Sequence, residues 1–549
     1  MNCCAFRNHK TRAGIMQCNS GKTLLGSINH ANRRQKIFRK RQLILRSRSV
    51  ASRAVRTASG KGFMCEVSYR SYPRRRTLAT SLRSPSDHDI DYFRSILSPN
   101  CIIEDTDSLD AYNTDWTHHW KGSSRVVLQP HSVEEVAEIL KYCHANWLPV
   151  VPQAGKTGLV GGSIPIDQEV ILSTSRLNQI KGLSTELGIL QCEAGCILQT
   201  AQDYCNERGF LVPIDLGAKG TCQIGGNLSS NAGGIYYYRY GSLAGNVLGV
   251  EAVTAMGDIV HLNYPQTQLK TNTGYKLHQL FIGAEGTLGI ITAISLLCPT
   301  LPRSKQAAWL GCTSFDHVLR LLHAAKFELG EILAAFEWMD WSVVTAMNRP
   351  APISADGNEI QHHVLIETHG SNNEHDSEKM ERFLEKVMLE QVVADGVLAQ
   401  DVDQMELFWM LRESCNPTVA AHGYTYKYDV SLSINDFGDF IDEMKNQLSG
   451  LEVLQTNWGH IMDGNLHFNV TTPNIFELDE TVLNRLEPYL FEAVMKRGGS
   501  ISAEHGLGQA KNRYLYQVHE PATLSMMRAL KETFDPRGIL NPNKLLPAI

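Results

Sequence analysis

The sequence predicts an α+β protein with more than one domain. Its 549 residues exceed what a single hydrophobic core organises, and the usual domain size suggests about two to four domains. From about residue 121 to Pro299, short apolar strands are joined by glycine-rich turns, whereas longer helices mixed with strands follow Pro302. We therefore expect a leader over residues 1–84, a first domain over 85–300, a second over 301–515 and a C-terminal segment over 516–549.

The leader is basic, whereas the rest of the chain is acidic. Residues 1–83 hold 20 Lys or Arg against one acid, Glu66, and the remainder carries 32 bases and 56 acids. A basic, acid-poor leader that contains Ser and Arg is typical of a mitochondrial transit region, so we expect a protein of the mitochondrial matrix. A nucleic-acid-binding arm is the alternative, but the clusters Arg33-Arg34 and Arg74-Arg75-Arg76 have no aromatic stacking platform around them. We therefore expect no nucleic-acid partner.

The cysteine pattern and the hydropathy exclude two further classes. The 13 cysteines are scattered, with no C-x-x-C pair and no even framework, so neither a disulfide scaffold nor a cysteine zinc finger is indicated. Free thiols in a reducing compartment fit this pattern best. No run of about 18 apolar residues occurs, so we expect no membrane span.

The first domain contains three glycine-rich segments. A helix opens at Ser132 with a capping-box pattern, and the strand Leu148–Pro152 then leads into the segment Gln153–Ser163. Two more glycine clusters follow, Gly217–Gly234 and Gly283–Gly289. Such loops present successive backbone N–H groups without side-chain obstruction, as proteins do when they hold a pyrophosphate. Tight turns of a small β-rich domain are the alternative, but three clusters so close together favour one extended ligand.

The spacing of the glycines excludes the best-known nucleotide loops. The chain contains no G-x-G-x-x-G. Neither Gly-Lys-Thr triplet, at residues 21–23 and 155–157, has the upstream glycine of a Walker loop, because Met16 and Val150 stand there. A NAD-binding Rossmann fold and a P-loop enzyme are therefore disfavoured.

The second domain carries residue types that bind metals. His460 and His467 flank the turn dipeptide Asp463-Gly464, after which apolar and polar residues alternate, so one face of a hairpin strand packs and the other faces a site. Glu504 and His505 follow farther along the chain. Two imidazoles and a carboxylate with an open position are typical of catalytic zinc, although this set accepts several divalent ions. The two histidines alone would indicate an ordinary hydrogen-bonded loop, and Glu504 with His505 favours the metal.

The second domain also contains two cationic residues of interest, and an apolar C-terminal tail follows it. Arg412 lies near the end of an expected helix, and Lys427 lies in the alternating strand Tyr424–Asp429. Considered alone, each is a solvated surface charge. The segment Phe534–Lys544 is punctuated by Pro and Gly but too apolar to be a loose end, so we expect it to dock on a domain.

Taken together, these segments resemble the FAD-linked D-2-hydroxyacid dehydrogenases. The resemblance extends in order over roughly residues 90–547 and includes Gly225–Asn227, Asn231–Gly234 and the tail motif Gly538–Pro542. It implies a two-part PCMH-type FAD-binding domain, an α+β cap domain that binds the substrate, and a C-terminal segment that returns to the FAD domain.

The resemblance also implies a role for each site residue. Zinc would be bound by His460, His467 and Glu504, and His505 would be the catalytic base. The substrate would be bound by Arg412, Asn416, Lys427 and Asn469. FAD would be held without a covalent bond, because no histidine occurs within Gln153–Ser163. Its expected contacts are Pro152, Gly155, Lys156, Thr157, Gly158, Leu159, Gly161, Gly162, Ser163, Gly225, Gly226, Asn227, Asn231, Gly233, Glu285, Gly286, Gly289, Ile290 and Asn541.

The implied reaction is the oxidation of a 2-hydroxy diacid, D-2-hydroxyglutarate, to 2-oxoglutarate. The base takes the hydroxyl proton, and a hydride passes to flavin N5. Electrons would then pass to an electron-transferring flavoprotein, and a homodimer is compatible with the family. A dehydrogenase of D-lactate or another short D-2-hydroxy acid is the enzyme alternative, because it shares the catalytic residues without needing Arg412 and Lys427.

Four residues depart from the family pattern, and one of them, Met462, lies in the turn between His460 and His467. Ala154 stands where Gly is usual in the flavin loop, Lys156 replaces a typical Asn, and Asn416 occupies a position that is typically Thr. The added Cβ of Ala154 could crowd the backbone that approaches the pyrophosphate, and the larger Asn416 puts the preferred acid length in doubt. A flavin-free relative that acts as a binding protein is therefore the non-enzyme alternative.

Overall fold

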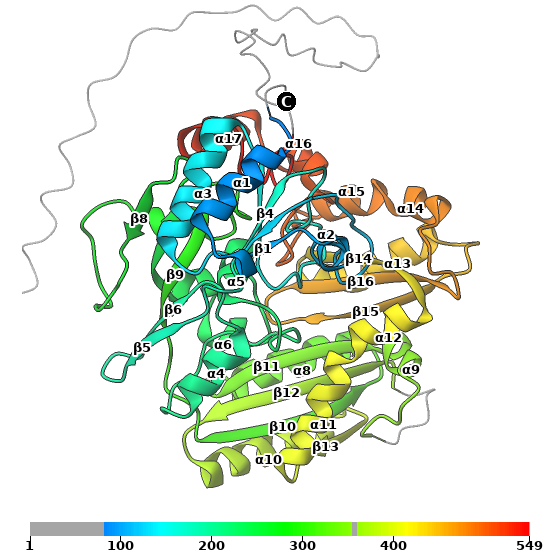
Figure 1. Ribbon diagram of the computed structural model, residues 1–549. Helices are drawn as coiled ribbons and strands as arrows, with labels where there is room; N and C mark the ends of the chain where they lie inside the picture. The colour runs from blue at the N-terminus through cyan, green and yellow to red at the C-terminus, as the bar shows by residue number, and fades with distance from the viewer. Residues whose placement is uncertain (1–81, 354–359, 548–549) are drawn as a thin grey trace, which may run out of the picture. The chain divides into compact units, whose positions relative to one another are not determined.

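The computed structural model describes residues 82–353 and 360–547, so nearly all of the leader lies outside the described residues and its transit role stays a prediction. Within these ranges the chain forms three β-sheets with helices packed on them (Figure 1). The strands are β1 (Ile102–Ile103), β2 (Val127–Leu128), β3 (Val150–Gln153), β4 (Val170–Ser173), β5 (Ile180–Ser184), β6 (Ile189–Glu193), β7 (Val247–Val253), β8 (Ile259–Leu262), β9 (Ile290–Leu297), β10 (Ser304–Cys312), β11 (Leu333–Asp340), β12 (His362–Gly370), β13 (Asp395–Leu398), β14 (Gly423–Ser431), β15 (Leu454–His460) and β16 (Asn465–Pro473). The α-helices are α1 (Asp87–Ile96), α2 (Thr106–Asn113), α3 (Val133–Asn146), α4 (Leu198–Asn206), α5 (Ile224–Ser230), α6 (Tyr237–Tyr240), α7 (Leu243–Asn246), α8 (Phe315–Glu328), α9 (Trp341–Ala346), α10 (Asn373–Leu389), α11 (Val402–Glu413), α12 (Cys415–His422), α13 (Phe437–Gln447), α14 (Glu480–Leu486), α15 (Tyr489–Lys496), α16 (Leu515–Val518) and α17 (Pro521–Phe534).

Two sheets make up the first half of the described chain, residues 82–303. The first has the strand order β1-β2-β4-β3, and its parallel strand β4 is buried at every residue, as expected for a strand that is covered on both faces. α3 packs on this sheet. Its predicted N-cap is confirmed, because Ser132 Oγ accepts a hydrogen bond from the Glu135 N–H at 3.3 Å.

The second sheet is antiparallel and has the order β5-β6-β9-β7-β8. α4 and α5 pack against the apolar side chains of β6, β7 and β9. Five cysteines belong to this core, and the nine cysteines in the described ranges are all buried and unpaired. The expectation of free thiols therefore holds for this part of the chain.

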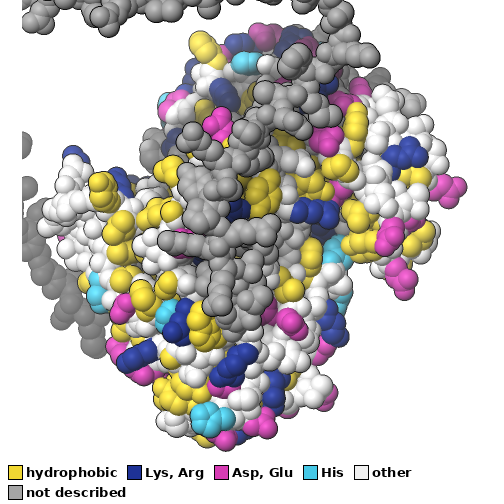
Figure 2. Space-filling model, turned by 90° about the horizontal axis from the view of Figure 1, so that it is seen from above, with side chains coloured by type: hydrophobic (Ala, Val, Ile, Leu, Met, Phe, Trp, Pro, Cys, Tyr) yellow, Lys and Arg dark blue, Asp and Glu magenta, His cyan; other side chains and the backbone are white. Residues whose placement is uncertain are grey.

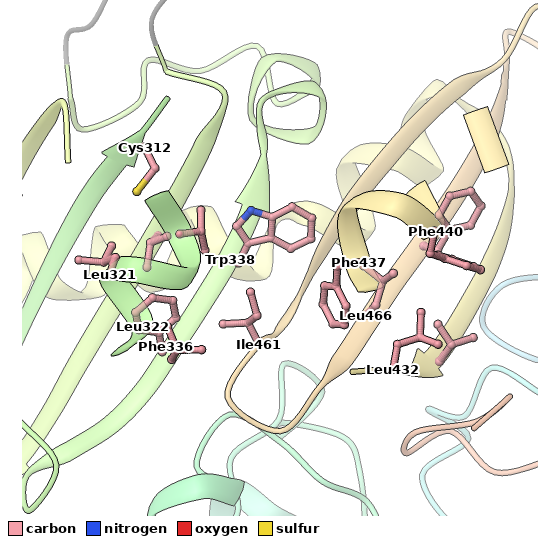
Figure 3. Close-up of a cluster of buried hydrophobic side chains, with 14 of the residues drawn as sticks. Cys312, Leu321, Leu322, Phe336, Trp338, Leu432, Phe437, Phe440, Ile461 and Leu466 are labelled. Atoms are coloured by element: carbon pink, nitrogen blue, oxygen red, sulfur yellow. The ribbon is translucent and has the colours of Figure 1, made fainter. Parts of the chain in front are cut away.

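A single seven-stranded antiparallel sheet organises the second half, residues 304–515. It begins with β10, directly after the predicted boundary at Pro299–Pro302, and has the order β13-β10-β12-β11-β15-β16-β14. One face carries a large hydrophobic core, in which Phe336 and Trp338 of β11 and Leu466 of β16 pack with Phe437 and Phe440 of α13 (Figure 3). Full burial of one such side chain stabilises a fold by roughly 1.5–3 kcal/mol, so this face holds the second half together.

The opposite face of the same sheet, which we call the site face, is polar near its β14 edge. Side chains alternate between the two faces of a strand, so Glu337 of β11, Asp429 of β14 and His467 of β16 lie opposite the core. α11 and α12 pack over the site face near β10, with Trp309 and Phe408 in the apolar contact. Elsewhere on the site face, Trp116 of the first half lies over Lys427, and Gly233 contacts Glu504.

The C-terminal segment contacts the first half. Leu540 lies in a parallel bridge with Val150 of β3, whose N–H donates to the Ile539 carbonyl oxygen at 2.8 Å. From α17, Lys531 Nζ donates to the carbonyl oxygen of Thr287 at 2.8 Å. The C-terminal segment thus extends the four-stranded sheet beside β3 and also contacts the third glycine cluster.

No helix in the described ranges combines the length and the apolar character that a membrane crossing requires. On the face that Figure 2 shows, the Lys and Arg side chains of the described residues are interspersed with Asp and Glu. A continuous basic stripe, the usual electrostatic footprint of nucleic-acid binding, is not seen among the described residues of that face.

Candidate active site

Two histidines and a glutamate converge above the site face. His460 ends β15 and His467 lies in β16, on either side of the predicted turn, where Gly464 has a φ of +79°. Glu504 Oε1 lies 3.7 Å from His460 Nε2 and 3.8 Å from His467 Nε2. Tetrahedral ligands about 2.1 Å from a zinc ion lie roughly 3.4 Å apart. Each histidine nitrogen would therefore need to approach the Glu504 oxygen by only a few tenths of an ångström to reach the spacing of two ligands on one cation.

Each histidine turns its other ring nitrogen toward a buried carboxylate. Glu337 Oε1 lies 2.8 Å from His460 Nδ1, and Asp429 Oδ1 lies 3.7 Å from His467 Nδ1. The strand register brings them there, because Glu337 pairs with His460 and Asp429 pairs with His467. A carboxylate behind a histidine fixes its tautomer and ring orientation, an arrangement that recurs behind metal-binding histidines. Glu337 and Asp429 were not identified from the sequence.

The charges of the cluster suit a cation. Burial raises the pKa of Glu504, but the neighbouring histidines outweigh it and hold this pKa well below its usual value. Burial lowers the pKa of His467 to about 3, so its ring is neutral and offers a lone pair. Burial also lowers the pKa of His460, but Glu337 and Glu504 raise it well above its usual value. A metal at His460 would therefore displace a proton.

Asp429 connects this cluster to His505. Its Oδ2 accepts hydrogen bonds from the N–H groups of Glu504 and His505, each at 2.9 Å, and lies 3.8 Å from His505 Nδ1. The His505 ring stacks on His467 with centroids 5.7 Å apart and borders the main cavity. Burial raises the pKa of Asp429, but His505 and Lys511 lower it to about 2. One ionised carboxylate therefore faces both a predicted ligand and the predicted base.

A different combination of neighbouring residues has metal-site spacing, and it leaves out His460. One ligand atom from each of Asp429, His467, Glu504 and His505 lies within 4.8 Å of the other three. This set shares His467 and Glu504 with the set predicted from the sequence. We favour the predicted set, because in it both histidines offer Nε2 while a carboxylate faces each Nδ1.

The first half of the chain fixes the glutamate of the cluster. Glu504 Oε2 accepts hydrogen bonds from the N–H groups of Gly233 and Gly234 at 3.1 and 3.0 Å. A Cβ at Gly233 would lie 2.6 Å from this oxygen, so only glycine allows the approach. Gly233, expected to contact the cofactor, thus contacts Glu504 and does not line the cavity.

A cavity of about 1690 Å³ extends from His505 along the glycine segments. Nothing lies within 4 Å of a Cβ built on Gly158, so a side chain there would project into the open space. The three glycine clusters thus border one hollow, as expected for one extended ligand. Its wall contains sixteen of the expected FAD contacts: Pro152, Gly155, Lys156, Thr157, Gly158, Leu159, Gly162, Ser163, Gly225, Gly226, Asn227, Glu285, Gly286, Gly289, Ile290 and Asn541.

The other expected contacts, besides Gly233, are set back from the cavity. Asn231 caps α5 in the left-handed region, with a φ of +52°. Gly161 has a φ of +68° and packs against Trp120, which a Cβ would approach to 2.7 Å. Both residues shape the loops and do not border the hollow.

Glu285 and Asn541 brace the glycine segments. Glu285 accepts hydrogen bonds from the N–H groups of Leu507 and Gly508, both at 2.8 Å, just after His505. Asn541 Nδ2 donates to the carbonyl oxygens of Gly162 and Glu285 at 3.0 and 2.7 Å. Burial raises the pKa of Glu285, although the two N–H donors oppose the shift. These side chains therefore couple the first and third glycine segments to the loop that carries the predicted base.

The structure brings Lys427 and Asn416 together. Lys427 Nζ lies 3.4 Å from Asn416 Oδ1 and 5.0 Å from the centroid of the Trp116 ring, and both neighbours border the cavity. Burial lowers the pKa of Lys427 to about 8, although Asp115 raises it. Within the described ranges no carboxylate lies within ion-pair distance of Lys427. Trp116 was not identified from the sequence, because an isolated Trp in a loop carries no motif.

The other two predicted substrate residues lie deeper. Arg412 of α11 is buried, and its guanidinium Nη2 lies 2.7 Å from Glu337 Oε2. Its Nε has no hydrogen-bond partner in the described protein, so a donor remains for a ligand. Asn469 pairs with Lys427 across β14 and β16 and donates to the His467 carbonyl oxygen at 3.2 Å. Arg412 and His460 thus share one buried carboxylate.

The departures in the flavin loop are accommodated. Ala154 lies beside Gly226, where a second Cβ would approach it to 2.8 Å, so the glycine provides the room that the alanine takes. Lys156 adopts a φ of +54° and borders the cavity, with Nζ 3.4 Å from the Thr114 carbonyl oxygen. A cation there would favour a diphosphate.

Family comparisons match both halves of the chain. Residues 124–263 match the FAD binding domain model, and residues 301–545 match the C-terminal domain model of FAD linked oxidases. The chain is 45% identical over 462 residues to D-2-hydroxyglutarate dehydrogenase, mitochondrial, of Danio rerio, covering 84% of this chain and 86% of that protein.

The chain is also similar to two more distant proteins. The chain is 39% identical to a putative mitochondrial D-lactate dehydrogenase of Schizosaccharomyces pombe, covering 84% of this chain and 90% of that protein. A solved structure of p-cresol methylhydroxylase with bound substrate superposes with a TM-score of 0.67 at 15% identity, covering 84% of this chain and 97% of that one. The predicted α+β fold with a PCMH-type FAD-binding domain is confirmed.

Proposed function

Since this chain belongs to the FAD-linked D-2-hydroxyacid dehydrogenase family and is an FAD-dependent oxidoreductase, we propose that it oxidises D-2-hydroxyglutarate to 2-oxoglutarate. One observation carries the choice of a diacid: Lys427 is an enclosed cation without a carboxylate partner in the described chain, and it lies between two residues of the cavity wall. Enclosing a charge is costly unless a counter-ion arrives. The distal carboxylate of a diacid would be that counter-ion, whereas a short monocarboxylate has no second carboxylate to place there.

The residues of the cavity fit FAD. Backbone N–H groups of the glycine segments would hold the diphosphate, and Lys156 would add a positive charge beside it. Bound FAD would accept the hydride from the substrate Cα. The protein's part is to place that carbon beside the ring and to exclude water. The hydrogen bonds from the Leu507 and Gly508 N–H groups to Glu285 would hold the loop that carries His505 in place.

The residues of the cluster fit a divalent metal, and we propose zinc. His460, His467 and Glu504 would hold it, and their outer contacts to Glu337, Asp429 and the Gly233-Gly234 backbone would set their orientation. A bound zinc would act as a Lewis acid toward the hydroxyl and carboxylate oxygens of the substrate.

We propose His505 as the base that takes the hydroxyl proton. Asp429 lies 3.8 Å from its Nδ1, so the carboxylate stabilises the ring once it has gained the proton at Nε2. Arg412 and Lys427 would bind the distal carboxylate, and Asn416 and Asn469 would donate hydrogen bonds beside them.

A substrate panel tests this proposal. Lys427→Ala should lower kcat/KM for D-2-hydroxyglutarate by about 30-fold or more, because removing one member of a desolvated charge pair costs roughly 2–5 kcal/mol. Turnover of D-lactate should change less than threefold. Lys326→Ala is a matched control, because Lys326 also lies over an aromatic ring, 5.1 Å from the Tyr238 centroid, away from the cavity wall. Equal losses with both acids would contradict the clamp, and turnover of D-lactate alone by the unaltered enzyme would reassign the substrate.

The pH dependence should differ between the two acids. Because burial lowers the pKa of Lys427 to about 8, the ammonium is present below this pH and is lost as the pH rises through it. We expect kcat/KM for D-2-hydroxyglutarate to fall above pH 8 by up to about tenfold per unit, the slope of a single deprotonation. Lys427→Arg stays charged and should remove this fall. The same decline with D-lactate would assign it to another group.

We further propose that the enzyme works in the mitochondrial matrix and passes its electrons to an electron-transferring flavoprotein. The basic leader supports import, and the relatives named mitochondrial support the same compartment. A fluorescent protein fused to residues 1–84 should enter mitochondria. Reduction of a purified electron-transferring flavoprotein should be much faster than reduction of oxygen.

A further inference from the structure

A loop of the first half, residues 114–121, lies between the first glycine segment and Lys427. A bridge between Thr114 and Lys121 closes this loop. The buried Asp115 organises its interior, because its carboxylate accepts hydrogen bonds from the N–H groups of Thr117 and Trp120 at 3.1 and 2.9 Å. The loop therefore has a defined shape and is more than a connection between α2 and β2.

Trp116 extends from this loop toward both neighbours. Its Nε1 donates to the Thr157 carbonyl oxygen in the glycine segment at 3.2 Å. The face of its ring lies 5.0 Å from Lys427 Nζ. The side chain is 48% exposed and borders the main cavity, so it is not a core residue that merely fills space.

A second contact holds the loop against the strand that carries Lys427. The His119 ring stacks on Tyr424 with centroids 4.3 Å apart and an interplanar angle of 23°. Tyr424 precedes Lys427 by three residues in β14. The position of Trp116 relative to Lys427 is therefore set from the glycine segment on one side and from β14 on the other.

We propose that Trp116 is a specificity-determining positioning residue, which holds the Lys427 ammonium toward the cavity and thereby sets the affinity for the distal carboxylate of a diacid. This inference rests on the proposed function. Trp116 acts through Lys427 and takes no part in the proton or hydride transfer.

The chemistry of the contact suits this role. A lysine ammonium is a point charge on a flexible four-carbon stem, so it needs a partner that restricts its direction. A carboxylate partner would neutralise the charge and compete with the substrate. An aromatic face attracts the ammonium without neutralising it, and Asn416 adds only a neutral acceptor at 3.4 Å. Lys427 is thus oriented while its charge stays available to an incoming anion.

Two variants of Trp116 separate the ring from its N–H group. Trp116→Leu should raise KM for D-2-hydroxyglutarate roughly 3- to 30-fold, the range that a cation–π contact corresponds to, with kcat and the KM for D-lactate nearly unchanged. Trp116→Phe keeps an aromatic face and loses the hydrogen bond to Thr157, so it should recover most of the affinity. Phe327→Leu, at an 86% exposed position on α8, is the control for loss of a surface aromatic ring.

A double-mutant cycle with Lys427→Ala decides how Trp116 acts. We expect Trp116→Leu to cause no further rise of KM when Lys427 is already alanine. The same rise of KM in both backgrounds would mean that Trp116 touches the substrate directly. Equal rises of KM for both acids would mean that Trp116 has a general role in folding. Either result overturns the inference. If Lys427→Ala is selective for the diacid and Trp116→Leu is not, the inference fails while the proposed function stands. If Lys427→Ala is itself unselective, the diacid assignment fails.

Discussion

Replacing His505 with asparagine should lower kcat by about 10²- to 10⁴-fold for every 2-hydroxy acid that the enzyme turns over, because a positioned general base contributes rate factors of this size. Asparagine has a similar shape and can still donate a hydrogen bond toward Asp429, but it cannot take a proton at neutral pH. The loop should keep its conformation, since the bond from residue 505 to Asp429 Oδ2 that fixes it is a backbone N–H bond at 2.9 Å. The flavin content should stay unchanged.

The rate of flavin reduction under anaerobic conditions is the appropriate measurement for His505→Asn, because it isolates the chemical step. His323→Asn is a control for loss of a histidine, since His323 is exposed on α8, far from the cluster in the chain. If the variant's flavin is reduced at a rate within a few-fold of that of the unaltered enzyme, His505 is not the base and another group of the cluster takes the proton.

Removing a ligand of the proposed metal site should have an effect at least as large. His460→Ala should lower the bound divalent metal from about one per chain to near zero, and kcat should fall by roughly 10³-fold or more, because a Lewis acid supplies several kcal/mol to the developing alkoxide. The losses should be similar for D-2-hydroxyglutarate and D-lactate, since both carry the hydroxyl and carboxylate groups that the metal would bind. Chelation should reproduce them, and added zinc should restore activity only to the unaltered protein.

Metal content distinguishes the two possible ligand sets. If His460, His467 and Glu504 hold the ion, His505→Asn should keep the metal while His460→Ala loses it. The opposite result would favour the set of Asp429, His467, Glu504 and His505, whose ligand atoms lie within 4.8 Å of one another. The thermal unfolding midpoint of each variant should be measured with and without added zinc. A destabilised but metal-loaded His460→Ala protein would contradict the assignment.

Local patterns in the sequence predict much of this fold. The alternation of apolar and polar residues after Gly464 predicts both faces of β16, one with Leu466 and Phe468 in the core and one with His467 on the site face. Ser132 predicts the start of α3, and the Pro299–Pro302 segment lies directly before β10, the first strand of the seven-stranded sheet. Each of these features depends on neighbouring residues, which is why the sequence alone suffices.

Contacts between distant segments are what the sequence does not reveal. Glu337 lies opposite His460 only because β11 pairs with β15, and no local pattern around Glu337 indicates that pairing. Asp429 could have been predicted from the sequence, because it follows Lys427 by two residues in an alternating strand and its side chain therefore lies on the same face. The hydrogen bonds from Gly233 and Gly234 to Glu504 likewise join residues far apart in sequence.

The resemblance to a known family supplied roles that the residues alone left open. The sequence alone indicates ordinary surface charges for Lys427 and Arg412. In the structure, Lys427 is enclosed beside the cavity and Arg412 is buried against Glu337. The structure thus gives a physical reason to regard both as part of a site. The roles of the individual residues stay predictions for the experiments described above.

Anaerobic reduction of the flavin by D-2-hydroxyglutarate, with and without prior chelation, tests the central claim most directly. The purified protein should be yellow, should lose its flavin absorbance rapidly on addition of this diacid, should fail to do so after chelation, and should recover when zinc is added back. A colourless protein, or a yellow one that D-lactate alone reduces, would contradict the account.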